Sequence, residues 1–135
     1  MKARIVGLVA AGVMATTLMA YAGEKWIYPV YINRNVDGSG SMGGTLGGTR
    51  NSADTVSRFG CYYESFTPAY GSYKYASCYG YDGTNYLSCG TTDPALTDTI
   101  SRITGDGYLW VQVDNAGNCT RVQIGSQSFA APKGP

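Results

Sequence analysis

The sequence lacks histidine entirely, and charged residues make up only 14% of its 135 positions. Without histidine, neither a Ser-His-Asp nor a Cys-His catalytic arrangement can form. The ten basic and nine acidic residues nearly balance, so the chain has no excess of positive charge of the kind that nucleic-acid-binding proteins carry. The composition therefore argues against enzyme activity, a nucleic-acid partner and a bound cofactor.

Long apolar runs are also missing, except at the N-terminus. Lys2 and Arg4 precede an apolar run that ends at Met19, and a small-x-small cleavage site occupies residues 20–22. This order of features is typical of a signal peptide that is cleaved from the mature protein. The sequence thus predicts a signal peptide over residues 1–22 and a secreted or periplasmic protein, with no membrane insertion after cleavage.

The remaining residues, 23–135, are enough for one domain with a modest core and too few for two. We expect a single β-rich domain, with residues 130–135 as a frayed tail.

Cysteine occurs four times, and each copy lies in the exported part: Cys61, Cys78, Cys89 and Cys119. An oxidising compartment favours two structural disulfides, for which three connectivities are possible. We favour Cys78–Cys89 together with Cys61–Cys119, because a hairpin places Cys78 opposite Cys89. A bond between Cys61 and Cys78 is the alternative.

Tyrosine, with 12 copies, is by far the commonest aromatic residue, and it is concentrated in residues 71–89. The period-two spacing of a strand places tyrosines on one face of this segment and mainly small residues on the other. Asp82-Gly83-Thr84-Asn85 has the composition of a hairpin turn, since Gly83 accepts a positive φ. A loop at Gly83 and Thr84 then sets Tyr81 opposite Tyr86.

This hairpin supplies the candidate ligand-binding residues, which are Tyr73, Tyr75, Tyr79, Tyr81 and Tyr86. Their rings and hydroxyl groups suit contact with a glycan or with another protein. A purely structural role is the alternative, because tyrosine is a strong strand former and cross-strand aromatic pairs stabilise sheets.

Strand patterns precede and follow the hairpin. Residues 26–34, 42–50 and 55–63 are predicted strands, of which the first contains Pro29 and is expected at a sheet edge. Residues 108–114 and 118–124 form a second hairpin, expected at the centre of its sheet, with Gly117 in the left-handed conformation. In this hairpin Leu109, Val111, Val113 and Cys119 are expected on one face, and Trp110, Val122 and Ile124 on the other.

One segment has helical periodicity. Asp93 is a suitable N-cap, Pro94 occupies the first helical position, and Leu96, Ile100 and Ile103 recur at helical spacing. The sequence therefore predicts an all-β fold: a small antiparallel β-sandwich or flattened barrel with one short amphipathic helix, linked by disulfides.

One short motif carries metal-binding chemistry in another family. Asp37-Gly38-Ser39-Gly40-Ser41 follows an apolar strand and resembles the Asp-x-Ser-x-Ser metal-ion-dependent adhesion site of von Willebrand factor A domains. The resemblance implies oxygen ligation of a divalent cation by Asp37, Ser39 and Ser41. That family is a doubly wound α/β fold with further ligands on later loops, whereas this chain is short and rich in strand patterns. Because Gly and Ser also form turns, we predict a turn without a metal and keep these three residues as the metal-binding candidates.

We therefore expect a non-catalytic binding module of the cell envelope or extracellular space, which contacts a glycan or a protein through its tyrosine-rich sheet face. An alternative is a structural subunit of an extracellular assembly or filament, which self-associates through the edge strand within residues 26–32. A third is a small hydrolase that uses two carboxylates.

Overall fold

The strands of this protein form two antiparallel sheets that pack face to face, as the computed structural model of residues 27–127 shows. The four-stranded sheet has the order β1-β2-β6-β7, with β1 at Tyr31–Arg34, β2 at Gly40–Thr45, β6 at Tyr108–Val113 and β7 at Cys119–Gly125. The three-stranded sheet has the order β3-β4-β5, with β3 at Arg58–Ser65, β4 at Lys74–Tyr81 and β5 at Tyr86–Thr91. The predicted β-sandwich is confirmed, while the predicted signal peptide and frayed tail lie outside the described residues.

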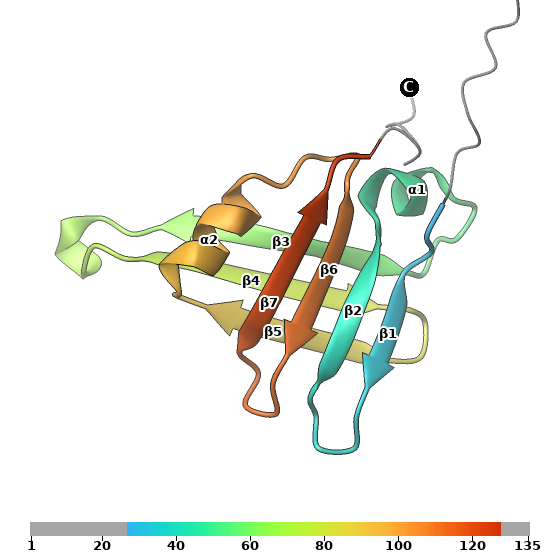
Figure 1. Ribbon diagram of the computed structural model, residues 1–135, viewed down its shortest axis with the longest axis horizontal. Coiled ribbons are helices and arrows are strands. Elements are labelled where there is room, and N and C mark those ends of the chain that lie inside the picture. Colours follow the sequence, from blue (N-terminus) through green and yellow to red (C-terminus); the bar gives the residue numbers. More distant parts are fainter. Residues whose placement is uncertain (1–26, 128–135) are drawn as a thin grey trace, which may run out of the picture.

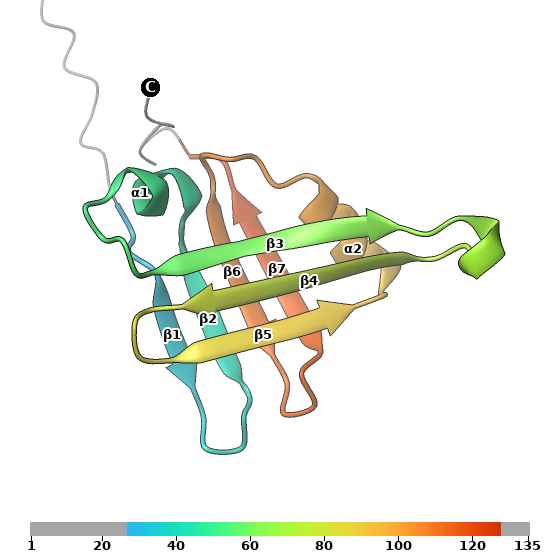
Figure 2. The same cartoon turned by 180° about the vertical axis from the view of Figure 1, so that it is seen from behind.

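The two layers are seen from opposite sides in Figures 1 and 2, which show their strands crossing at a steep angle. Helices α1 at Leu46–Asn51 and α2 at Pro94–Ser101 lie at the ends of the sandwich, and a single 3₁₀ turn at Pro68–Tyr70 lies in the β3–β4 loop, which projects from it (Figure 1). The amphipathic helix α2 packs against β7, β4 and β3, so it covers the end of the core between the sheets.

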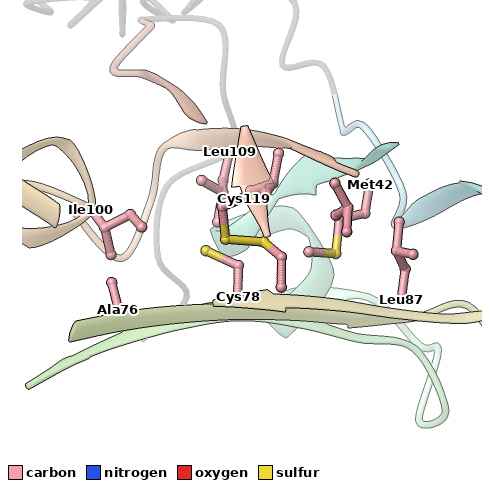
Figure 3. Packing of buried hydrophobic residues seen from close by; sticks show 10 residues of the cluster. Met42, Ala76, Cys78, Leu87, Ile100, Leu109 and Cys119 are labelled. Atoms are coloured by element: carbon pink, nitrogen blue, oxygen red, sulfur yellow. A yellow bond between two sulfur atoms is a disulfide. The ribbon is translucent and has the colours of Figure 1, made fainter. Parts of the chain in front are cut away.

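The core lies between the sheets, where Met42, Leu109 and Cys119 of one layer face Ala76, Cys78 and Leu87 of the other (Figure 3). The β4 residues on this side are small, as the alternation predicts. Gly80 is one of them, and a Cβ atom there would stand 3.1 Å from the Met42 sulfur and 3.2 Å from Ile32 Cδ1. The small face of β4 thus makes room for the larger side chains of the opposite sheet.

Helix α2 begins as its sequence predicts. The Asp93 carboxylate accepts hydrogen bonds from the backbone N–H groups of Ala95 and Leu96, each at 2.9 Å, and Pro94 occupies the first turn. These contacts satisfy two N–H groups that have no partner within the helix. The helix ends at Ser101, just before Gly105, and Ile100 anchors it in the core.

The register of the tyrosine hairpin is also confirmed. Tyr81 pairs with Tyr86 and Cys78 with Cys89, and Gly83 adopts a φ of 95° in the connecting turn. Turn chemistry and strand alternation are both local properties, which is why a single stretch of sequence is sufficient to predict this hairpin.

The favoured disulfide pairing is wrong. Cys78 bonds to Cys61 of β3, with Cα atoms 4.0 Å apart, and Cys89 bonds to Cys119 of β7. Cys78 has a cysteine in register on each side, since β3 and β5 both pair with β4. The β6–β7 turn determines which of these two cysteines bonds to Cys78. The Gly90 N–H group donates a hydrogen bond to the Gly117 carbonyl, and this contact brings Cys119 beside Cys89. Cys89 therefore bonds to Cys119, and Cys78 bonds to Cys61.

The prediction for the glycine-rich segment is only half right. Residues 40–45 form β2, but residues 46–50 are part of α1 and not of a bulged strand. Gly47 and Gly48 are buried, and a Cβ atom on Gly48 would collide with the Thr45 side chain and with Ile27. These glycines therefore permit a tight helical turn against β2.

The predicted faces of the β6–β7 hairpin are wrong for two residues, Val122 and Ile124. Val113 pairs with Cys119 but Gln112 pairs with Arg121, so Thr120 is an additional residue in β7. This β-bulge reverses the alternation after Cys119. Val122 and Ile124 consequently pack against the core and not on the outer face. In addition, β7 lies at the edge of its sheet, whereas β6 is central as expected.

Candidate functional site

The outer surface of the three-stranded sheet, whose strands lie in front in Figure 2, carries tyrosines from all three strands. Ala76, Cys78 and Gly80 are buried along β4, so the side chains between them point away from the core. We call this surface the tyrosine face, and it consists of Tyr62, Tyr75, Tyr79, Tyr81 and Tyr86.

Small residues separate these tyrosines. Tyr79, at the centre of the face, has Gly60 of β3 on one side and Ser88 of β5 on the other. A Cβ atom added at Gly60 would meet no atom within 4 Å. The Tyr79 ring is therefore open to solvent on its β3 side, and 39% of the residue is exposed.

Contacts with neighbouring residues restrain the rings of Tyr62, Tyr75 and Tyr81. Tyr75 leans over β5, because a Cβ atom on Gly90 would stand 2.6 Å from its hydroxyl oxygen. Tyr62 packs at a tilt against Tyr75, with ring centroids 6.2 Å apart. The Tyr81 hydroxyl donates to the Gly83 carbonyl at 2.9 Å. These contacts restrain three of the five rings.

Four tyrosines of the face keep their hydroxyl groups available. Within residues 27–127, Tyr81 alone among the five makes a side-chain hydrogen bond, and Tyr86 is 54% exposed. A phenol group can both donate and accept a hydrogen bond. The face thus presents apolar ring surface together with unused polar groups.

The structure brings together four of the five candidate tyrosines. Tyr73 precedes β4, and its ring stacks on Phe66 in the β3–β4 loop, with centroids 4.5 Å apart. Tyr62 joins the face although its sequence context did not single it out. Tyr62 pairs with Ser77 of β4, and this pairing places it on the outer face. Alternation along β3 assigns Tyr62 to a face only when the register between β3 and β4 is known.

Two of the three metal-binding candidates, Asp37 and Ser39, are hydrogen-bonded to each other. The Asp37 carboxylate accepts hydrogen bonds from the backbone N–H and the hydroxyl of Ser39, at 3.0 and 2.6 Å, which lowers the pKa of Asp37. Ser41 lies on β2, where it pairs with Asn33. Among residues 27–127 no group of three Asp, Glu, Cys or His side chains is placed to hold a metal ion. Asp37 and Ser39 instead stabilise the β1–β2 turn.

Two disulfides indicate an oxidising compartment. None of the helices within residues 27–127 has the length and apolar character needed to cross a membrane. Comparison with protein-family models, with curated proteins and with solved structures finds no match for this chain. Its function therefore has to be inferred from its own surfaces.

Proposed function

We propose that this protein is an exported, non-catalytic binding module that holds a partner protein on its tyrosine face. The observation that carries the proposal is the arrangement of tyrosine side chains from three adjacent strands on one outward surface, separated by glycine and serine.

The composition of the face matches what protein recognition requires. Tyrosine supplies a large contact area with few rotatable bonds, and neighbouring glycine and serine allow close approach of a partner. Arg58 lies beside Tyr81 at one end of the face and Glu64 beside Tyr75 at the other. Such an arrangement, aromatic at the centre and charged at the rim, is typical of interfaces in which a few residues dominate the binding energy.

Rigidity favours the same function. The Cys61–Cys78 disulfide joins β3 to β4 beneath the face, and the Cys89–Cys119 disulfide ties β5 to the other sheet. A surface that is already ordered loses little conformational entropy when it binds. A flat and rigid aromatic surface suits a protein partner better than a single small molecule, for which an enclosed pocket is usual.

A matched set of tyrosine variants tests the proposal. Tyr79→Ala combined with Tyr86→Ala removes two exposed rings, and Tyr70→Ala is the control because Tyr70 is 78% exposed on the 3₁₀ turn outside the face. Envelope and extracellular proteins of the source organism are passed over the immobilised mature protein, and retained partners are purified and titrated. We expect the double variant to weaken binding at least about 30-fold, corresponding to about 2 kcal/mol, and the control to bind normally.

Equal binding by the double variant would overturn the proposal. Binding to a glycan array that is lost in the double variant, without any retained protein, would replace the protein partner by a glycan.

A second candidate function is supported by the position of β1. This strand lies at a sheet edge, as predicted, although Pro29 precedes it, and its outer backbone groups have no strand beside them within residues 27–127. A neighbouring copy that paired there would extend the sheet into an assembly. Size-exclusion chromatography over a range of concentrations distinguishes the two functions, because a constant monomer contradicts assembly through β1.

A further inference from the structure

A polar groove of about 520 Å³ lies on the outer face of the four-stranded sheet. Residues of the β1–β2 and β6–β7 turns line it, and these turns project from the same end of the sheet (Figure 1). The groove is therefore separate from the tyrosine face, which belongs to the other sheet. Its volume is within the range of about 300 to 1,000 Å³ that is usual for small-molecule sites.

The floor of the groove is a row of polar side chains from three strands. Asn33 of β1 pairs with Ser41 of β2, and Ser41 pairs with Gln112 of β6. All three line the groove. Within residues 27–127 the amide groups of Asn33 and Gln112 make no hydrogen bonds to other residues. Two unused amides thus lie on either side of a hydroxyl.

Trp110 provides the apolar part of the groove. It lies in the next row of the sheet, opposite Gly43, where a Cβ atom would stand 3.0 Å from the indole Cδ1. The Arg121 guanidinium lies over the indole, 5.5 Å from the ring centroid. Trp110 is therefore held in place by a close approach to β2 and by a cation–π contact.

The two turns contribute one carboxylate each. Asp114 accepts hydrogen bonds from the backbone N–H groups of Ala116 and Asn118, at 2.9 and 2.8 Å, and from the Asn118 side chain. These bonds lower the pKa of Asp114, as the bonds from Ser39 lower that of Asp37. Both carboxylates are ionised at neutral pH and act only as hydrogen-bond acceptors there.

The ligand that fits this set of groups is a neutral sugar. An amide both donates and accepts, which complements a sugar hydroxyl, and an indole ring covers the apolar C–H face of a pyranose. Two negative carboxylates disfavour phosphate and other anions. Both oxygens of Asp114 and one oxygen of Asp37 accept hydrogen bonds within their own turns, which disfavours a metal ion.

We propose that this groove binds a neutral hexose unit of a glycan, with its ring against Trp110 and its hydroxyls on Asn33 and Gln112. Hydrolysis is not part of the proposal, because a glycosidase needs one carboxylic acid that keeps its proton. With a protein on the tyrosine face, such a module would connect a glycan to a protein from opposite layers of the sandwich.

The test titrates the mature protein with methyl glycosides of glucose, galactose, mannose and N-acetylglucosamine, and screens it on an array of neutral oligosaccharides. Gln112→Ala removes one amide of the floor. Gln127→Ala is the matched control, since Gln127 is exposed beyond the end of β7 and lines a different pocket. We expect saturable binding of at least one sugar, weakened about tenfold or more by Gln112→Ala and unchanged by Gln127→Ala.

Three further variants distinguish loss of the sugar contact from loss of the fold and from failure of the tyrosine face. Trp110→Phe retains an aromatic ring and should weaken binding less than Trp110→Ala, while circular dichroism checks that each variant is folded. The double variant Tyr79→Ala and Tyr86→Ala should bind sugar normally, so failure of the tyrosine face and failure of the groove are distinguishable. Absence of saturable binding, binding that Gln112→Ala leaves intact, or binding that requires added Ca²⁺ would each overturn the proposal.

Discussion

Cys89 of β5 is bonded to Cys119 of β7, with Cα atoms 5.0 Å apart, so this disulfide spans the two sheets of the sandwich. The other disulfide, Cys61–Cys78, lies within the three-stranded sheet. Both bonds are formed around one buried cluster, in which Cys78 is in register with Cys61 and with Cys89. Since Cys78 has two cysteines opposite it, the connectivity decides which strand of the three-stranded sheet is joined covalently to β7.

Tryptic digestion without reduction tests this connectivity. Trypsin cleaves after Lys74 and Arg102, which leaves Cys78 and Cys89 in one peptide, with Cys61 and Cys119 in two others. The structure predicts that both bonds join this central peptide to its neighbours, so that mass spectrometry detects the three peptides as one linked species. A central peptide with an internal bond, separate from a linked Cys61–Cys119 pair, would contradict the structure.

Gly80→Ala should destabilise the protein by about 1 to 3 kcal/mol, because the added methyl group overpacks a tight core. Its Cβ atom would stand 3.1 Å from the Met42 sulfur and 3.4 Å from Phe59 Cδ2. The matched control is Gly60→Ala on β3, where the methyl group meets nothing within 4 Å. Alanine lowers the entropy of the unfolded chain at that site, so we expect no loss and up to about 1 kcal/mol of gain. Urea unfolding measures both, and equal effects of the two substitutions would contradict the packing described here.

The elements that local sequence determines were predictable. The Tyr81–Tyr86 register depends on a turn residue and on alternation, and helix α2 depends on the Asp93 cap and on helical periodicity. Elements that depend on distant residues were not predictable in the same way. The partner of Cys78 depends on the placement of β3, and the faces of Val122 and Ile124 depend on a bulge at Thr120 that the residues themselves do not mark.

The same distinction between local and long-range determinants applies to the candidate sites. Tyr75, Tyr79 and Tyr81 alternate within one strand, so the sequence alone places them on one face. The groove combines Asn33 with Gln112, which lie far apart in the chain and become neighbours only through the pairing of β2 with β1 and β6. Asp37, Ser39 and Ser41 also line that groove, but their chemical surroundings differ from those of the metal site that these residues resemble.

Asp93→Ala should cost about 1 kcal/mol of stability, because it leaves the N–H groups of Ala95 and Leu96 without their acceptor. Asp98→Ala on the same helix is the control. Its carboxylate pairs with Arg102 at 2.9 Å, but both side chains are more than half exposed. Exposed pairs of this spacing contribute only about 0.3 to 0.5 kcal/mol. If chemical unfolding shows the Asp98 substitution to be the more damaging, the capping interaction is not what fixes the start of α2.

Acid should destabilise the protein through its turn carboxylates. Hydrogen bonds lower the pKa of Asp37, Asp54, Asp82 and Asp114 in the folded protein. A lowered folded pKa means that the unfolded chain takes up protons first as the pH falls. The stabilisation is therefore complete above the ordinary aspartate pKa of about 3.9 and is lost as the pH falls through the lower folded value.

Asp114→Asn isolates one of these contributions. Asp114 receives its largest pKa shift from the Asn118 side chain, followed by the Asn118 backbone N–H. An asparagine at this position retains an acceptor oxygen but has no charge to lose, so the variant should be less stable than the native protein at pH 7. The difference between their unfolding midpoints should shrink as the pH falls below about 4. A difference that stays constant from pH 7 to pH 2 would show that the ionised carboxylate contributes nothing to the β6–β7 turn.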